Sequence, residues 1–434
     1  MRRQATGARA AAILRYQDRL PDPVQAGMEL GVDAVLAAAF ERVGDQLRVA
    51  ARLVAAADGR TLWATEIAAP LADMFGLLDT ISDSVARALQ PEASPGSAPR
   101  TAGARPPAMP AAAVWELCLK GRVHLLRDTM VDCIAAVDCF DKARAADRGY
   151  APAWAGLADA YARLAFDHQP EGDWYRRAEE MCDQAMRIDP ILPEGRYVRA
   201  RLLWSPQAGF DHAGALREAG AALAADPTLL EARMKVGGVL MHVGMLAESE
   251  RQYREILGLS PGHAAAEGAM GLCLYYRARF DDAHDLTAAA ARGTPAFWLS
   301  YQLALCQLQL GRHDEAERTA GHMHPVRGLL AALRGDAFEA RREARVVAET
   351  LKPYGHFHHA QYDIACIHAL LSGAEEALRW LAAAACNGFP CAPFFAADPL
   401  LANLRGEPRF QRLLDELAEE RSRYARVYAE LPAA

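Results

Sequence analysis

Long hydrophobic runs, paired cysteines and lysines are scarce in this 434-residue chain, and each scarcity narrows the range of possible functions. No apolar stretch approaches the length of about 20 residues that a membrane-spanning helix needs. The nine cysteines are scattered without a CxxC pair, which is typical of single buried thiols in a reducing compartment. We therefore expect a cytoplasmic protein without a membrane segment.

The charge balance is mildly acidic, with a formal net charge of -7. Nearly all basic residues are arginine, and this ratio, beside abundant alanine and glycine, is typical of GC-rich coding. The charges are spread along the chain and form no basic patch of the kind that binds a phosphate backbone. The sequence therefore predicts no direct contact with nucleic acid.

Motifs for catalysis and cofactor binding are also missing. The sequence contains no G-x-x-x-x-G-K-[ST] loop and no G-x-G-x-x-G after a predicted strand. Residues 258–262 match G-x-S-x-G, but a nucleophile elbow needs a strand before the serine, and ESERQYREILGL predicts a helix there. The sequence therefore favours a protein that is not an enzyme and has no cofactor.

Residues 1–89 predict a small α/β domain. Apolar and polar residues alternate in three short segments, and Asp58-Gly59 between two of them is a strong hairpin turn signal. A fourth segment has apolar residues at helical spacing. The predicted elements are strands at Val32–Arg42, Gln46–Ala56 and Thr61–Ile67, and a helix at Asp73–Leu89.

The rest of the chain divides into a linker and a region of paired helices. Residues 90–111 are rich in Pro, Ala, Gly and Ser, which predicts an extended linker. Within residues 112–426, prolines recur with spacings of 37, 34 and 34 residues, and each interval holds two helix-length stretches rich in Ala and Leu. These prolines are Pro190, Pro227, Pro261 and Pro295.

The second helix pair carries the strongest repeat pattern, in which small residues let two helices approach and a proline ends the second helix. Its pattern residues are Trp154, Leu157, Ala158, Tyr161, Ala178, Ala185 and Pro190. A two-helix unit of this length resembles the tetratricopeptide repeat. The resemblance implies a mainly α fold: a tetratricopeptide-type α-solenoid of seven or eight helical hairpins, preceded by the small α/β domain. Arg196 and Arg199 stand where that pattern has apolar residues.

Four segments together resemble a family of bacterial regulators that join a TolB-amino-terminal-like domain to tetratricopeptide repeats: residues 27–69, 73–89, 150–164 and 387–414. Members of that family carry a winged-helix, Ser/Thr kinase or nucleotidyl cyclase effector, which this sequence does not show. Residues 2–16 also stand where the family's first strand and helix would end. The resemblance implies a regulatory scaffold in signalling or gene regulation. The alternative is the sensory half of a DNA-binding transcription regulator.

Histidines cluster at His356, His358, His359 and His368, with Asp363 among them. On a helix, His359 and Asp363 would share a face at i, i+4, which suits zinc. However, no HExxH motif is present, and packing at a helix start explains the histidines equally. We predict no metal site, and a metal-dependent enzyme remains the less favoured hypothesis.

The inner surface of the solenoid is the predicted binding site, because the first helix of each hairpin lines the concave side. Aromatic side chains and arginine at these positions are the types enriched in binding hot spots. The inward residues are expected to be Tyr197, Arg201, Trp204, Met234, His242, Tyr276, Trp298, Tyr301 and Tyr362. We expect this groove to bind a protein or peptide partner. An unpaired strand edge within residues 30–69 also predicts a homodimer.

Overall fold

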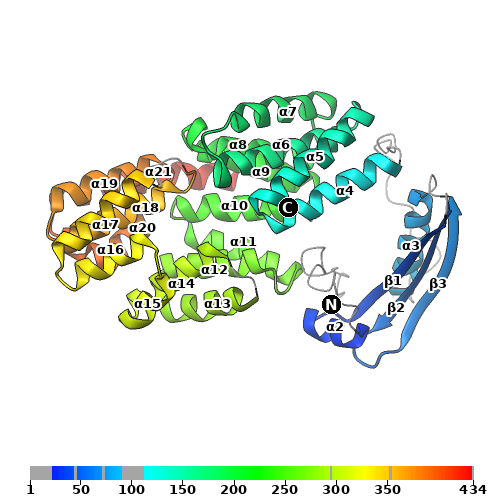
Figure 1. Cartoon of the computed structure of the whole chain (residues 1–434), viewed down its shortest axis with the longest axis horizontal. Coiled ribbons are helices and arrows are strands. Elements are labelled where there is room, and N and C mark those ends of the chain that lie inside the picture. Colours follow the sequence, from blue (N-terminus) through cyan, green and yellow to red (C-terminus); the bar gives the residue numbers. More distant parts are fainter. Residues whose placement is uncertain are drawn as a thin grey trace.

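The computed structural model describes residues 22–43, 46–70, 74–89, 112–293, 296–350 and 354–432. It confirms the expected fold class, because a small three-stranded antiparallel sheet precedes a long array of paired helices (Figure 1). The predicted linker and the Thr294-Pro295 pair lie outside the described residues.

The front unit is built from two helices and a sheet with strand order β1-β2-β3. Its elements are α2 (Pro23–Leu30), β1 (Ala34–Val43), β2 (Gln46–Ala55), β3 (Thr61–Pro70) and α3 (Met74–Leu89). All three predicted strands and the predicted helix are present, and β3 extends beyond its predicted end. Gly59 adopts a φ of 72° in the turn between β2 and β3, a conformation that glycine accepts without strain.

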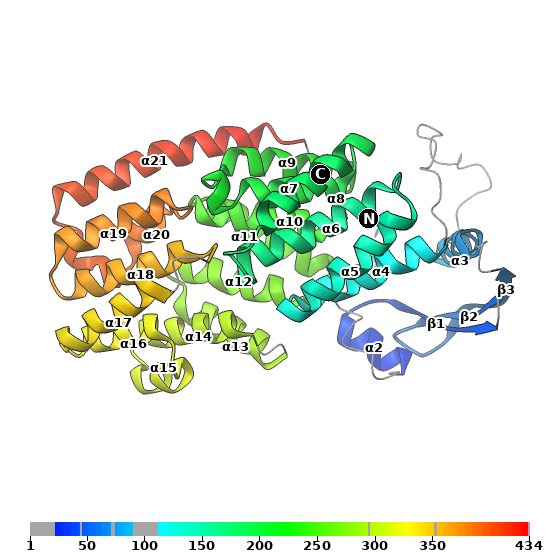
Figure 2. The same ribbon diagram turned by 45° about the horizontal axis from the view of Figure 1, so that its top comes forward.

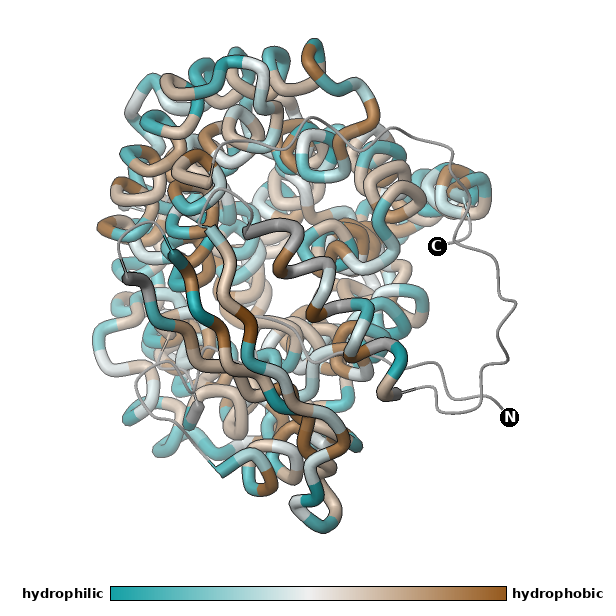
Figure 3. Tube along the Cα trace, turned by 90° about the vertical axis from the view of Figure 1, so that its right-hand side faces the viewer, coloured by the Kyte–Doolittle hydropathy of each residue, from teal (hydrophilic) through white to brown (hydrophobic). Residues whose placement is uncertain are grey.

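Alternation along β2 gives the sheet one buried face. Val49, Ala51 and Leu53 are buried, while the residues between them are exposed. Leu77 and Ile81 of α3 pack onto this face and form a small separate core with Val49, Ala51 and Ala69. Figure 3 shows the three strands side by side, with both hydrophobic (brown) and hydrophilic (teal) residues along them.

Eight helix pairs follow in the described part of the chain, consistent with the seven or eight predicted. They are α4 (Ala112–Arg127) with α5 (Met130–Ala146), α6 (Ala151–Arg163) with α7 (Trp174–Ile188), α8 (Pro193–Leu203) with α9 (His212–Ala225), α10 (Leu230–His242) with α11 (Leu246–Leu259), α12 (Ala264–Tyr276) with α13 (Phe280–Gly293), α14 (Phe297–Gln309) with α15 (His313–Ala320), α16 (His324–Leu333) with α17 (Ala337–Thr350), and α18 (Phe357–Leu370) with α19 (Ala374–Cys386). Each first helix also contacts the first helix of the next pair from α4 to α18, so these helices form one continuous row.

Small residues set the distance between helices. Ala178 and Ala185 on α7 are fully buried, as the repeat pattern requires. Phe140 of α5 is also fully buried, and its ring lies against Gly121 of α4 and Gly156 of α6. The absence of a side chain at these two glycines makes room for the ring between the first two hairpins.

Two arginines that depart from the repeat pattern form ion pairs between helices. Arg196 of α8 pairs with Glu218 of α9 at 3.1 Å, and Arg199 of α8 pairs with Asp183 of α7. The guanidinium groups of both arginines lie between helices and are partly exposed, so water and a carboxylate can solvate them.

The end of the chain folds back onto the middle of the solenoid. The residues after α19 form α20 (Ala392–Ala397), a 3₁₀ segment at Pro399–Leu404 and the long helix α21 (Pro408–Ala429). Helix α21 runs back to contact α9, and Figure 2 shows it crossing one side of the molecule. We call residues 387–397 the return segment. Its aromatic rings pack against the first helices and so cover part of the concave face.

Ser260 of the G-x-S-x-G match follows helix α11, not a strand, and α12 begins four residues later. This segment is a helix-to-helix turn and lacks the backbone of a nucleophile elbow. Among the described residues, no helix is both long and apolar enough to cross a membrane.

The glycine contacts around Phe140 predict a position-specific stability loss. A Cβ atom at Gly156 would lie 2.2 Å from Cε1 of Phe140, so we expect Gly156→Ala to destabilise the fold by about 1–3 kcal/mol. Gly258 of α11 has no atom within 4 Å of its added Cβ, so Gly258→Ala should be neutral or stabilise by up to about 1 kcal/mol. Urea unfolding followed by circular dichroism compares the two variants, and equal midpoints would contradict this packing.

Dimerisation through the front sheet stays a prediction. In the described sheet, β1 and β3 are edge strands, and Phe40 and Leu36 of β1 are exposed. Light scattering should give twice the monomer mass for the chain, and Leu36→Lys with Phe40→Lys should return it to a monomer. A monomeric parent chain refutes the prediction.

Candidate binding site on the inner face

Polar and charged side chains follow the row of first helices. Spacings of four residues place Asp159 and Arg163 of α6 on one helix face, and likewise Tyr197 and Arg201 of α8. Lys235 and His242 of α10 lie two turns apart on the next helix. The same repeat period that builds the solenoid therefore brings these groups onto its inner face.

The first part of the site is a ladder of ion pairs. Arg163 contacts Asp128 at 2.8 Å and Asp159 at 3.2 Å, and Arg201 contacts Asp167 at 2.8 Å. Both arginine side chains are largely buried, so these carboxylates compensate charges that water reaches poorly.

Lys235 stands beside this ladder. Its ammonium nitrogen lies 4.5 Å from the centre of the Trp204 ring, a cation–π distance. Among the described residues, no carboxylate lies within ion-pair distance of it. Burial, and next the positive charge of Arg201, lowers the pKa of Lys235 to about 7. Lys235 is therefore a partly neutral amine at neutral pH, held against an aromatic ring.

Four histidines meet next to Trp204. One ligand-capable atom from each of His242, His356, His358 and His359 lies within 4.8 Å of the others. The Nε2 atoms of His242 and His359 are 3.2 Å apart. His242 Nδ1 lies 2.7 Å from the Gly238 carbonyl oxygen, and His359 Nδ1 lies 3.1 Å from the Tyr276 hydroxyl. We call these four histidines the histidine cluster.

Burial keeps the histidine cluster neutral. It holds the pKa of His242, His358 and His359 well below the usual range, and the neighbouring rings add to the shift. The Asn387 backbone opposes the shift at His358 but does not reach hydrogen-bond geometry. The His356 side chain is open to solvent, yet the surrounding protein and the charge of Lys235 lower its pKa to about 3.

Two buried carboxyl groups, those of Asp363 and Asp398, lie at the far end of the row of first helices. Tyr301 donates a hydrogen bond to Asp363, and Tyr362 donates one to Asp398 at 2.5 Å. Burial raises the pKa of Asp363 to about 7, although the Tyr301 hydroxyl partly offsets the shift. Asp398 also accepts a hydrogen bond from Gln309 and one from the Leu400 backbone N–H, both at 2.8 Å. These contacts tie α14 and α18 to the segment after α20.

The predicted groove residues divide into two groups. Five are buried by the chain itself and offer little surface in this conformation: Tyr197, Trp204, His242, Tyr276 and Tyr362. Arg201, Met234 and Tyr301 are partly exposed, and Trp298 is 43% exposed. The period predicts which residues point inward, but the start of α18 and the return segment cover many of them. The binding role of all nine stays a prediction.

His359 and Asp363 have different partners: Asp363 accepts a hydrogen bond from Tyr301, and His359 lies beside His242. His368 is also outside the histidine cluster, and His242 of α10 takes its place. The repeat period predicted His242 as an inward residue, but no local signal could have placed it beside His359, which lies 117 residues later. The sequence likewise held no signal for Asp167 or for Phe389, whose ring packs on His242 and His359.

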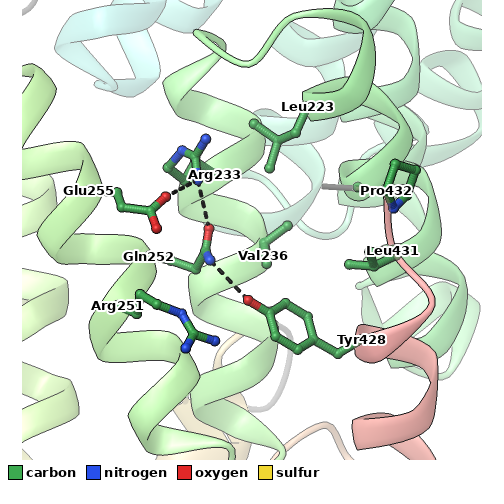
Figure 4. A pocket seen from close by; sticks show the side chains of 10 residues that line it. Leu223, Arg233, Val236, Arg251, Gln252, Glu255, Tyr428, Leu431 and Pro432 are labelled. Carbon is green, nitrogen blue, oxygen red and sulfur yellow. Dashed lines mark hydrogen bonds and ion pairs between the residues drawn. The ribbon is translucent and has the colours of Figure 1, made fainter. Parts of the chain in front are cut away.

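Apart from these clusters, a depression lies between α9, α10, α11 and the end of α21 (Figure 4). Its volume is about 240 Å³. Arg233 pairs with Glu255 and donates to Gln252 at 3.2 Å, and Gln252 donates to the Tyr428 hydroxyl at 3.0 Å. Because these groups bond to one another, the depression is best explained as a joint between α21 and the solenoid.

Comparison with known proteins gives partial similarities. No family model matches the chain. "Putative adenylate cyclase 3" of Rhizobium meliloti (strain 1021) is 26% identical over 191 residues, which are 43% of this chain and 32% of that protein. The chain therefore spans about a third of the length of this curated relative.

Several solved repeat structures are similar in part. YrrB, described as a TPR protein with an unusual peptide-binding site, is 23% identical, with a TM-score of 0.28 over 41% of this chain and 86% of that one. TTC0263, a thermophilic TPR protein of Thermus thermophilus, is 18% identical, with a TM-score of 0.37 over 45% and 100%. The human IFIT1 dimer with PPP-AAAA is 16% identical, with a TM-score of 0.42 over 62% and 72%. The helix pairs of this chain, and not these partial similarities, define its fold.

His212 predicts a pH dependence of stability. Burial lowers its pKa to about 4, and its Nε2 lies 3.2 Å from the Gly388 carbonyl oxygen in the return segment. An unfolded histidine titrates near 6.5, so the unfolded chain takes up a proton first as the pH falls. Stability is therefore complete above pH 6.5 and falls by roughly 3 kcal/mol towards pH 4 from this group alone.

The measurement is the free energy of unfolding at pH 7.5 and 4.5. His212→Gln keeps a donor for the Gly388 carbonyl but cannot titrate, so it should lose less stability on acidification than the parent chain. The exposed His322 supplies the control, because His322→Gln should follow the parent chain. An equal acid loss in His212→Gln contradicts a buried neutral His212.

Proposed function

We propose that this solenoid is a non-catalytic binding module that docks an acidic segment of a partner protein and serves bacterial signalling. The observation that carries the proposal is Lys235, an amine on the inner face that forms no close ion pair among the described residues, although Asp167 and Asp159 act on it from a longer distance. A desolvated amine gains a strong charge-assisted hydrogen bond when a carboxylate arrives.

The surroundings of Lys235 favour an anion that is attached to apolar groups. Arg201 adds a second positive charge, which Asp167 partly compensates. Trp204 supplies an aromatic wall beside the amine. Further along the row of first helices, Phe297 and Trp298 are exposed, and the Trp298 ring packs over Gly268 of α12. Aromatic and basic groups in one row are what a protein segment needs for anchoring.

The signalling role rests on the relatives. One curated relative is named as a putative adenylate cyclase, and the sequence resembles regulators that carry tetratricopeptide repeats. All nine cysteines are free thiols, which supports a reducing compartment such as the cytoplasm. We infer that the solenoid supplies the docking or sensory part of such a system.

The reactivity of Lys235 provides a direct check of its electrostatics. With a pKa of about 7, roughly half of the amine is neutral at pH 7, compared with less than about one part in a thousand for an ordinary lysine. A small acylating reagent at pH 7 should therefore modify Lys235 before Lys120 and Lys142, which are exposed and paired with carboxylates. Peptide mapping by mass spectrometry reads out the order, and early labelling of Lys142 contradicts the predicted pKa.

Binding is tested with an array of acidic peptides and their amide counterparts. We expect the chain to retain acidic peptides, and we expect Lys235→Met to weaken binding at least about tenfold by removing a charge-assisted bond. Lys142→Met is the matched control, and Trp298→Ala with Tyr301→Ala tests the apolar part of the row. Equal binding by Lys235→Met, or preference for the amide peptides, overturns the proposal.

A further inference from the structure

The histidine cluster joins two distant parts of the solenoid. His242 comes from the end of α10, while His356, His358 and His359 come from the start of α18. Together they place one ligand-capable nitrogen each within 4.8 Å of the others, around a common centre. The proposed docking of an acidic segment does not use these atoms, so they require a separate explanation.

The hydrogen bonds of His242 expose a lone pair to this centre. A carbonyl oxygen only accepts, so His242 Nδ1 must donate to Gly238. The Nε2 atom of the neutral ring is then unprotonated and faces Nε2 of His359 at 3.2 Å. Donation from the outer nitrogen to a backbone carbonyl is the arrangement that orients metal-bound histidines.

The separation of these two nitrogens fits a metal ion. With Zn–N bonds of about 2.0–2.1 Å, the edge of a ligand tetrahedron is about 3.3–3.4 Å long. Without an ion, a ring proton on His359 Nε2 has to bridge the pair. With an ion, that proton transfers to Nδ1 of the same ring, where the Tyr276 hydroxyl oxygen at 3.1 Å can accept it.

His358 is the second, independent observation. Its side chain is only 1% exposed, yet neither ring nitrogen has a hydrogen-bond partner. A buried polar group left without a partner costs about 1–3 kcal/mol. The rings of Phe210, Trp204 and Phe389 surround it and provide no acceptor for its N–H. A ligand that accepts a nitrogen lone pair would satisfy one of these two atoms.

We propose that His242, His356, His358 and His359 bind a divalent late transition-metal ion, with Zn²⁺ as the first candidate. Imidazole nitrogen suits Zn²⁺, Cu²⁺ and Ni²⁺, whereas Mg²⁺ and Ca²⁺ require oxygen ligands. His356 is open to solvent, so an ion can reach the centre from that side.

The charges around the histidine cluster influence which further ligand binds together with the metal ion. Lys235 and Arg201 lie close enough to His356 to oppose a second cation there. Four neutral imidazoles supply no negative charge, so an anion entering beside His356 balances the ion. The bound ion would cross-link α10 to α18 and thereby stabilise the contact between these two helices.

The test uses the full chain after treatment with a chelator, followed by titration with Zn²⁺ and with Co²⁺. We expect one ion per chain, an absorption spectrum of tetrahedral Co²⁺, and a rise in melting temperature that grows with free Zn²⁺. Mg²⁺ should cause no shift. Substoichiometric binding, or Co²⁺ that stays six-coordinate as in water, overturns the site.

Variants identify the ligands. His356→Ala changes a solvent-exposed residue, with its fold checked by circular dichroism, and it should weaken Zn²⁺ binding at least about tenfold, since even outer partners of metal ligands contribute about 10–100-fold. His358→Gln should do the same, with its fold checked by circular dichroism. His322→Ala is the matched control and should bind like the parent chain. If His356→Ala binds Zn²⁺ as tightly as this control, the assignment is wrong, whereas the binding of acidic peptides is measured independently.

Discussion

The contact between the inner face and the end of the chain determines the chemistry of the site. His242 meets His359 across 117 residues, and His212 meets Gly388 across 176. Phe389 and Phe394 fill the space between these parts by packing on Tyr276. An open solenoid would leave the same histidines and Lys235 in water with ordinary pKa values. Closure therefore converts a row of polar side chains into a desolvated site, and the aromatic burial offsets the cost of that desolvation.

Local patterns predicted the elements that local interactions produce. Alternation around Asp58-Gly59 predicted the hairpin of β2 and β3, because register follows from the turn and one buried face. Small residues such as Ala178 and Ala185 predicted the close approach of helices, and both are fully buried. The period also predicts that Tyr197 and Trp204 point inward, and both side chains are buried.

Long-range contacts escaped the same reasoning. The spacing of His359 and Asp363 places both on one helix face, but it gives no sign that Tyr301 of α14 is the hydrogen-bond partner of Asp363. Nothing near His242 in the sequence indicates that α18 returns to it. The repeat period predicts how each hairpin packs on its neighbour. It therefore predicts the row of first helices, but not which distant segment covers that row. The sequence could therefore predict the solenoid, but not which of the expected inner residues remain exposed.

Trp204 connects the two halves of the site, because it touches Lys235 on one side and His242, His356 and His358 on the other. The charge of Lys235 lowers the pKa of His356, so the two centres already interact through space. A metal ion in the histidine cluster and an acidic segment at Lys235 carry opposite charges, so each would attract the other. Thermodynamic reciprocity requires both effects to have the same size. An acidic partner and a metal ion would then each strengthen the binding of the other, and both would act by holding the same closed solenoid.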